Sequence, residues 1–309
     1  MHFDWLSDLS PALKAQEYWQ QRNYQQEGIF QVVYKPRRPF AISCGAGLLA
    51  EHIRHFRFSP AFIQRMGQMT AGGGGSIFSE SFLNHLQRMR LRVNVWAPPE
   101  GMLLLPGEPL AIASGPIEQI YLLESAFRFL LWRSSQWATR IASARWAAHN
   151  WTEEDTPVAP SSTFNFDGWK IRAEYIGGAL ADDILDTIKE PSRPPDPEEG
   201  LHPLSADGLV QVRRVFKGQT ALGDIWLTSA QEELASVSRT RADMRDIRTA
   251  SIQTLSFTRF QNLYQPVLVK GHPVLSNTRI SYLRQRTLKQ LEMFQEGKLE
   301  AYPRGFSCL

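Results

Sequence analysis

The sequence predicts an α+β protein that lacks a complete (β/α)8 barrel. In its first half, alternating or β-branched segments such as residues 28–34 and 91–101 are interleaved with amphipathic helical segments. A long apolar segment at residues 117–148 then predicts a buried helix. Only residues 149–209, 61 in all, separate it from the strand predicted to begin at Val210. A (β/α)8 barrel takes about 250 residues and at least about 200, so it does not fit.

The composition is that of a globular protein. Of the 309 residues, 43% are hydrophobic and 21% are charged, and the formal net charge of +3 is too small by itself to indicate nucleic-acid binding. Cys44 and Cys308 lie far apart and fit no metal-ligand spacing, which favours free thiols and a cytoplasmic location. Arg128 and Arg133 interrupt the longest apolar run, so we expect no membrane span.

Several further elements are predicted before residue 100. These are a helix at 11–21, a helix at 46–56, a helix that Ser59 caps with Pro60 in its first turn, and a helix within 79–89. The glycine-rich residues 71–76 lack the Lys-Ser/Thr of a phosphate-binding loop, so we interpret them as a flexible insertion. His52 and His55 have no carboxylate or cysteine companion at ligand spacing, so we expect surface histidines and no metal site.

Residues 100–145 carry a recognisable order of short motifs. These are Glu100-Gly101, Pro106-Gly107-Glu108-Pro109-Leu110, Gly115-Pro116, Leu122-Leu123-Glu124 and Ala138-Thr139-Arg140. This order resembles the nicotinate phosphoribosyltransferase family, in which the block closes an N-terminal domain and leads into a catalytic barrel. The resemblance covers about residues 1–150 and, more weakly, 209–306. It implies that Glu100 and Glu108, although tempting as an acid–base pair, are structural.

The resemblance also suggests where ligands would bind if the family's site were retained. Glu174-Tyr175-Ile176-Gly177-Gly178 resembles a family motif that contacts substrate. The phosphate-binding candidates are Arg37, Arg38, Arg140 and Arg145, and the substrate-binding candidates are Tyr175, Gly177 and Gly178. Lys35, Arg37 and Arg38 also fit an ordinary solvated basic turn.

Three departures from the family pattern argue against catalysis. Ser10 stands where the family has a tyrosine that stacks on substrate, and Ser143 replaces a second basic residue after Arg140. The family's Gly-Thr-x-Ala-His-Ser stretch, which supplies its catalytic histidine, has no counterpart around the later histidines. We therefore assign no catalytic residue and expect no cofactor.

The second half of the chain contains a weak internal similarity and a basic segment. Residues 170–187 align without gaps to 211–228, so 170–187 is either a barrel remnant or a β-hairpin that pairs with the second copy; we favour the paired hairpins. Residues 229–255 predict a helix on which arginines alternate with acidic residues, more typical of a solvated helix than of a nucleic-acid surface. Its arginines are Arg239, Arg241, Arg245 and Arg248. Residues 264–275 predict a hairpin, and Asn277 can cap a final helix.

We therefore predict three regions: an N-terminal domain (1–150) like that of the family, a remnant hairpin with a proline-rich linker (151–208), and a C-terminal hairpin and helix segment (209–309). The predicted function is that of a degenerate, non-catalytic binding or assembly subunit, either a homo-oligomer or part of a hetero-complex. The alternatives are a phosphoribosyltransferase of nicotinate/NAD salvage type whose site is rebuilt between subunits, able to take a small phosphorylated ligand, and nucleic-acid binding by the arginine-rich helix. No membrane partner is expected.

Overall fold

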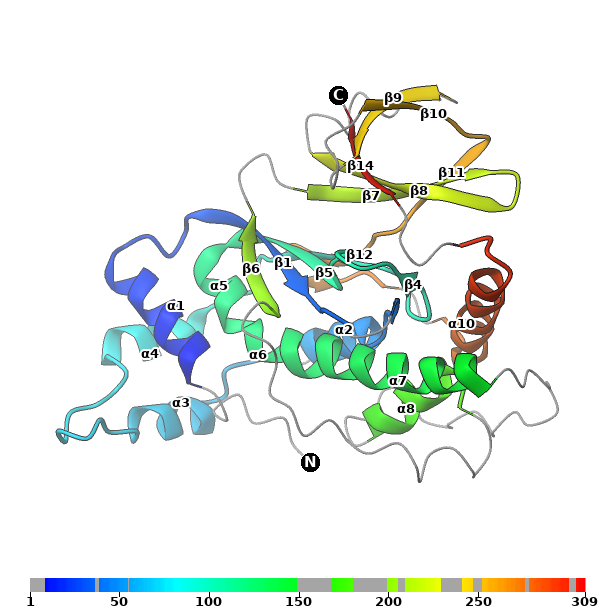
Figure 1. The fold of residues 1–309 in the computed structure, drawn as a ribbon. Coiled ribbons are helices and arrows are strands. Elements are labelled where there is room, and N and C mark those ends of the chain that lie inside the picture. Colours follow the sequence, from blue (N-terminus) through cyan, green and yellow to red (C-terminus); the bar gives the residue numbers. More distant parts are fainter. Residues whose placement is uncertain are drawn as a thin grey trace.

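The structure is a computed structural model that describes residues 9–36, 39–54, 56–148, 168–179, 199–204, 209–228, 241–246, 252–275, 278–299 and 304–308. In these residues it is a mixed α+β fold built on two six-stranded sheets (Figure 1). Neither sheet closes on itself, so no closed barrel occurs among the described residues. No helix in these ranges is long and apolar enough to cross a membrane.

The first sheet is antiparallel and draws its strands from both halves of the chain. Its order is β13-β12-β3-β5-β1-β6. The strands are β1 (Glu27–Val33), β3 (Asn94–Ala97), β5 (Ala111–Pro116), β6 (Gly200–Leu204), β12 (Gln265–Val269) and β13 (His272–Pro273). β12 pairs with β3, and β6 pairs with β1, so late segments complete a sheet begun by residues before 117. A short separate pair is formed by β2 (Ala41–Ile42) and β4 (Leu103–Leu104).

The described helices before residue 149 lie beside the first sheet and at one of its ends (Figure 1). They are α1 (Ser10–Gln20), α2 (Ala46–Arg54), α3 (Pro60–Gly67), α4 (Glu80–Arg88), α5 (Ile117–Leu122), α6 (Glu124–Ala126), a π-helical turn η1 (Phe127–Trp132) and α7 (Arg133–Ala148). The predicted helical segment at 117–148 is therefore present, but a turn at Leu123 interrupts it and its winding changes at Phe127–Trp132. The predicted cap at Ser59 is confirmed, because its hydroxyl accepts from the Phe62 amide at 3.2 Å.

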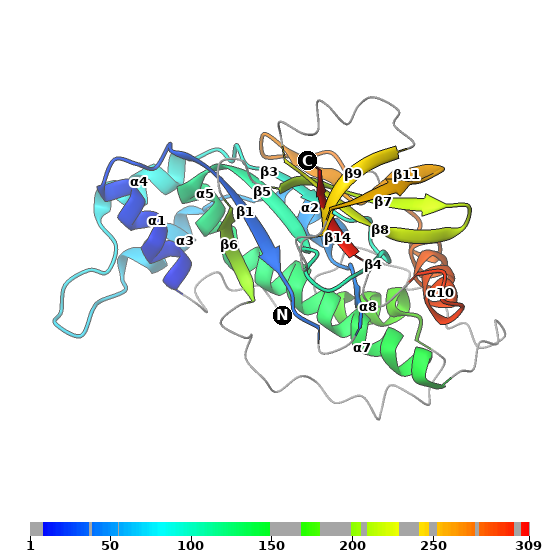
Figure 2. The same ribbon diagram turned by 45° about the horizontal axis from the view of Figure 1, so that its top comes forward.

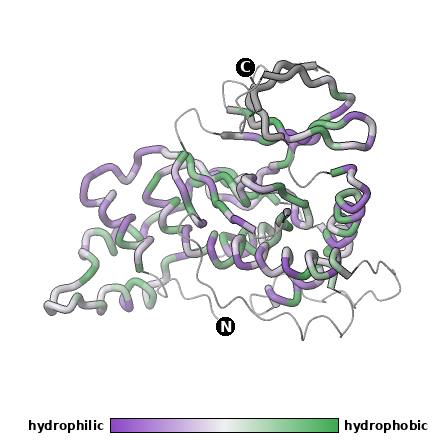
Figure 3. The backbone as a smooth tube through the Cα atoms, viewed as in Figure 1, coloured by the Kyte–Doolittle hydropathy of each residue, from purple (hydrophilic) through white to green (hydrophobic). Residues whose placement is uncertain are grey.

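The interior is apolar in the way the sequence periodicity predicts. The largest cluster joins the inner faces of β1, β3, β5 and β12 to α2, α5 and η1, with fully buried Val95, Ile120, Leu130 and Val267 among its members. Figure 3 shows hydrophobic residues along these inner elements and alternating character along α10 (Ile280–Gln295). Ile280, Leu283, Leu291 and Phe294 form the buried stripe of α10.

The second sheet has the order β10-β9-β14-β8-β7-β11. Its strands are β7 (Leu209–Lys217), β8 (Thr220–Thr228), β9 (Arg241–Asp246), β10 (Ile252–Ser256), β11 (Arg259–Asn262) and β14 (Arg304–Cys308). Only the β14–β8 pair is parallel. In Figures 1 and 2 this sheet and α10 lie at one end of the first sheet, and α1, α3 and α4 lie at the other.

Two sequence-based predictions are wrong in the described residues. Residues 169–177 form helix α8 (Trp169–Gly177), not the first strand of a hairpin, because this segment packs along α7 and ends at Gly178 in a left-handed conformation. The helix predicted at 229–255 is replaced at Arg241–Asp246 and Ile252–Ser256 by the paired strands β9 and β10. Pairing with β14 in the sheet overrides the helical propensity of that segment. Residues 180–187 and 229–240 lie outside the described ranges, as does Asn277; α10 begins after Arg279.

The hairpin predictions elsewhere are confirmed. β7 and β8 pair in antiparallel register around residues 218–219. β12 and β13 form the predicted hairpin, with Lys270 and Gly271 at its turn, where both residues have positive φ.

Candidate functional site

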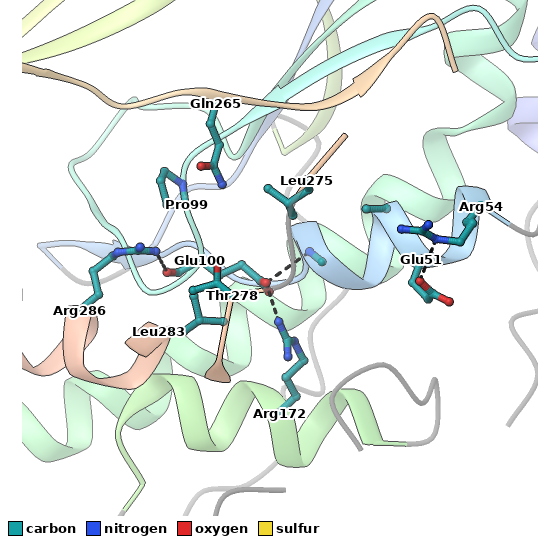
Figure 4. A pocket seen from close by; sticks show the side chains of 12 residues that line it. Glu51, Arg54, Pro99, Glu100, Arg172, Gln265, Leu275, Thr278, Leu283 and Arg286 are labelled. Carbon is teal, nitrogen blue, oxygen red and sulfur yellow. Dashed lines mark hydrogen bonds and ion pairs between the residues drawn. The ribbon is translucent and has the colours of Figure 1, made fainter. Parts of the chain in front are cut away.

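The block that carries the family motifs contains a buried carboxylate, Glu100, at the junction of three helices. It lies in the turn before β4, and its Oε1 accepts from the Gly45 amide at 2.7 Å. Its Oε2 accepts from the Gly47 amide at 3.3 Å and from Nη2 of Arg172 at 2.6 Å. Figure 4 shows these contacts, which join α2, the β4 turn and α8.

The pocket around Glu100 is small. Its volume is about 40 Å³, and its lining includes Arg54, Arg172, Arg286 and Leu283. A cavity of this size holds one or a few water molecules but no substrate. Arg286 of α10 donates to the Glu100 carbonyl oxygen from the other side (Figure 4). The arrangement therefore fastens α2, α8 and α10 to one turn, which agrees with the structural role expected for Glu100.

Glu108 takes part in a second buried ionic cluster, which we call the Arg214 clamp. Arg214 of β7 binds both oxygens of Asp224 on β8, with Nε to Oδ1 at 2.9 Å and Nη2 to Oδ2 at 3.1 Å. It also reaches Oε2 of Glu108 at 3.4 Å and the Leu103 carbonyl oxygen at 3.1 Å. The clamp therefore ties the second sheet to the β4 turn.

The clamp holds two carboxyl groups and one guanidinium. Burial, followed by the neighbouring Asp224 carboxylate, raises the pKa of Glu108 well above its ordinary value of 4.5, and Arg214 offsets this only in part. A carboxyl whose pKa is raised by folding binds its proton more tightly in the folded than in the unfolded chain. Its contribution to stability is complete below pH 4.5 and is lost as the pH rises through the folded pKa.

We therefore predict that Glu108→Gln flattens the pH dependence of stability. The wild-type free energy of unfolding should fall relative to that of the variant as the pH rises from 4.5, because the amide of the variant has no proton to lose. Urea denaturation between about pH 4.5 and 9 measures the difference. Glu17→Gln on exposed α1 is the control and should track the wild type. A constant difference between the wild type and Glu108→Gln across this range contradicts the assignment.

The structure brings four of the predicted ligand residues together, but in helix packing. Gly177 lies so close to α7 that an added Cβ would be 2.6 Å from the Ala138 carbonyl oxygen. Arg145 donates from Nη1 to the Gly178 carbonyl oxygen at 2.9 Å. Tyr175 is 6% exposed, and its carbonyl oxygen accepts from Arg284 of α10 at 3.1 Å.

The two arginines bind the carboxyl-terminal end of α8, where a cation is favoured by the helix dipole. The Arg284 guanidinium also lies 5.2 Å from the centre of the Tyr175 ring. Burial, and then the charge of Arg145, lower the pKa of Arg284 to about 10. The carbonyl oxygens at the end of α8, among the predicted ligand-binding residues, are thus bound by side chains of the same chain.

The other candidates are not part of this cluster. Arg37 and Arg38 lie outside the described residues, as does His55. Arg140 is five residues before Arg145 on α7, so it points elsewhere on the helix and interacts electrostatically with Tyr34. Ser143, which replaces the family's second basic residue, donates to the Thr139 carbonyl oxygen at 2.7 Å.

Of the two predicted surface histidines, the structure describes His52, which is half-buried rather than exposed. Burial lowers its pKa to about 4. Within the described ranges, no three potential metal ligands lie together.

Sequence reasoning missed the arginines that organise these clusters. Arg172 and Arg214 bind carboxyl groups that precede them by 72 and 106 residues, and Arg284 binds a carbonyl 109 residues earlier. No local spacing signals such pairs. The available signal was the polarity of three arginines inside otherwise apolar periodic segments, because a buried charge needs a partner.

Comparison with known proteins finds members of the family that residues 100–145 resemble. No protein-family model matches the chain. It is 27% identical over 228 residues to human nicotinate phosphoribosyltransferase, covering 66% of this chain and 41% of that protein. It is 31% identical over 144 residues to the bovine protein (45% and 26%) and 29% identical over 125 residues to nicotinate phosphoribosyltransferase PncB2 of Mycobacterium tuberculosis (38% and 25%). The chain belongs to the nicotinate phosphoribosyltransferase family.

The fold comparison agrees with this membership. The crystal structure of human nicotinic acid phosphoribosyltransferase matches with a TM-score of 0.71 at 12% identity, over 97% of each chain. Nicotinate-nucleotide pyrophosphorylase from Pyrococcus furiosus matches with a TM-score of 0.52, also at 12% identity, over 93% of this chain and 94% of that one. In sequence, this family member spans less than half the length of the curated relatives it matches, at 25%, 26% and 41%.

Proposed function

We propose that this family member is a non-catalytic subunit that serves binding or assembly. The observation that carries the proposal is the arrangement around α8. Its family-like Tyr175-Ile176-Gly177-Gly178 segment packs on α7, and the carbonyl oxygens at its end are bound by Arg145 and Arg284. A substrate would have to displace two charge-assisted hydrogen bonds, each worth about 1.5–3 kcal/mol.

The small number of residues between α7 and β6 supports the same proposal. Between α7 and β6 the sequence has 51 residues, 149 to 199, and the described part of this stretch contributes only α8 as a regular element. A strand and helix alternation that closes a barrel needs about 200 residues. Ser10, at the start of α1, offers no ring for stacking a flat substrate.

The face for assembly is proposed at α8 and α10. These helices pack together, and each exposes a large apolar side chain: Ile171 is 58% exposed and Tyr282 is 56% exposed. A contiguous apolar patch is typical of a surface that another chain covers, and the proposal places these two side chains in one such patch. We propose that a second copy of this chain covers this face, and binding of a different subunit is the other outcome of the test. A cytoplasmic location stays a prediction.

Size-exclusion chromatography with light scattering tests the assembly. We expect a particle of at least twice 35.2 kDa at micromolar concentration, which Ile171→Asp reduces to 35.2 kDa. Leu13→Asp on α1, where Leu13 is 42% exposed, is the matched control and should leave the mass unchanged. A stable 35.2 kDa wild-type particle argues against a homo-oligomer, and co-purification of a second protein then identifies the hetero-complex.

The second candidate is a phosphoribosyltransferase whose site is rebuilt between subunits. It is favoured by the names of the relatives, which are nicotinate phosphoribosyltransferases. Calorimetry with phosphoribosyl pyrophosphate and nicotinate separates the candidates, because millimolar or tighter binding of both would support the enzyme. Nucleic-acid binding by an arginine-rich helix is not proposed, since Arg241 and Arg245 belong to strand β9.

A further inference from the structure

A second cavity, larger than the one at Glu100, lies between the second sheet and α10. Its volume is about 230 Å³. Its lining residues come from the β4 turn, from β7 and β11, and from α10 and the turn after it. They are Met102, Arg214, Phe216, Arg259, Gln261, Arg286, Lys289, Gln290, Met293 and Leu299.

The charged residues that line this cavity are all basic. Four of its ten lining residues are arginine or lysine, and none is acidic. Arg214 is neutralised by the carboxyl groups of its clamp, but within the described ranges no ion pair forms at Arg259, Arg286 or Lys289. Guanidinium and ammonium groups that converge on a cavity without carboxylates favour an anion.

The positions of two of these cations are fixed by other contacts. The Arg259 guanidinium lies 3.6 Å from the centre of the Phe216 ring, a cation–π contact that holds it over β7. Arg286 is half-buried and donates one Nη1–H to the Glu100 carbonyl oxygen, which leaves its remaining N–H groups for other acceptors. Lys289 is exposed on α10, about one helical turn after Arg286.

The remaining lining is apolar or uncharged. Met102, Met293 and Leu299 supply an apolar wall, and Gln261 adds an amide. The walls are also held together, because the Ala221 amide of β8 donates to the Lys298 carbonyl oxygen at 2.8 Å. Together with the Arg214 clamp, this contact fixes the sheet against α10 around the cavity. An apolar wall beside fixed cations suits a small molecule that has both an anionic and an apolar part.

We propose that this cavity binds a small organic phosphate: the phosphate on Arg259, Arg286 and Lys289, the organic part on Met102, Met293 and Leu299. Phosphate is the anion chosen because its oxygens accept several N–H donors at once and match guanidinium geometry. This site is separate from the α8 cluster and does not depend on whether the chain assembles or catalyses.

Calorimetric titration with three probes tests the site: phenyl phosphate, inorganic phosphate and phenol. Phenyl phosphate should bind saturably, more tightly than inorganic phosphate, and phenol should not bind. Arg259→Gln and Lys289→Gln should each weaken phenyl phosphate about tenfold or more, the loss expected for one charge-assisted hydrogen bond. Arg88→Gln, which changes an exposed arginine in the last turn of α4, is the matched control and should have no effect.

Three results would overturn the proposal. One is the absence of saturable heat with phenyl phosphate at millimolar concentration. Another is an equal loss in Arg88→Gln and Arg259→Gln, which means that phosphate associates with surface charge in general. The third is that inorganic phosphate binds as tightly as phenyl phosphate, which would mean that the apolar wall does not contribute to binding. The titration measures ligand binding by the full chain. A negative titration therefore does not bear on the assembly proposal, and a monomeric chain does not bear on the phosphate-binding proposal.

Discussion

Glu100→Gln should destabilise the protein by about 3 to 5 kcal/mol. The substitution leaves the Arg172 guanidinium, which is 3% exposed, without its carboxylate, and a buried charge whose partner is removed costs about that much. It also replaces one carboxylate oxygen by an NH2 group, which donates and therefore cannot accept from Gly45, Gly47 or Arg172. Denaturant unfolding followed by circular dichroism measures the change.

The matched control is Glu292→Gln on the exposed face of α10, which should change stability by less than about 0.5 kcal/mol. The double variant Arg172→Met, Glu100→Gln should lose less free energy of unfolding than the sum of the losses in the two single variants, because the pair is removed as a unit. If Glu100→Gln costs no more than its control, the Glu100 junction does not hold α2, α8 and α10 together.

Gly101→Ala should destabilise the protein by a similar amount, about 3 to 5 kcal/mol. A Cβ at this position would overlap the Leu283 carbonyl oxygen of α10 and lie 2.9 Å from Oγ1 of Thr287. The obstacle is helix backbone, which cannot move without withdrawing α10 from the β4 turn. Gly101 also has φ +78, where a side chain adds about 1 to 2 kcal/mol of strain.

Gly107→Ala separates the two causes. Gly107 has φ +97 in the neighbouring turn, but an added Cβ there meets nothing within 4 Å. It should therefore cost only the backbone strain, about 1 to 2 kcal/mol. Equal losses in the two variants, measured by the same denaturation, would mean that the close approach of α10 to Gly101 contributes nothing.

The sequence predicted the elements whose signals are local. The hairpin at 264–275 follows from its β-branched strands and the Lys270-Gly271 turn, and the helix after Ser59 follows from its cap and Pro60. The hairpin and helix predictions depend on residues within one or two turns of each other. The structural role of Glu100 and Glu108 was also predicted, but from the family resemblance of the block that contains them.

What the sequence could not predict depends on distant contacts. The placement of β12 beside β3, and of α10 against the β4 turn, is decided by packing between segments far apart in the chain. The same holds for α8: its apolar positions fit either a strand or a helix, and contact with α7 through Gly177 selects the helix. For β9, sheet pairing prevailed over a helical charge pattern.

We propose that this member of the nicotinate phosphoribosyltransferase family does not catalyse the reaction for which its relatives are named. The most direct test is formation of nicotinate mononucleotide from radiolabelled nicotinate and phosphoribosyl pyrophosphate, with and without ATP and Mg²⁺. The full chain is assayed at micromolar concentration beside the human enzyme as a positive control. We predict no product above the level of a sample without protein. Product that accumulates in proportion to the concentration of this chain, over several turnovers, would contradict the claim.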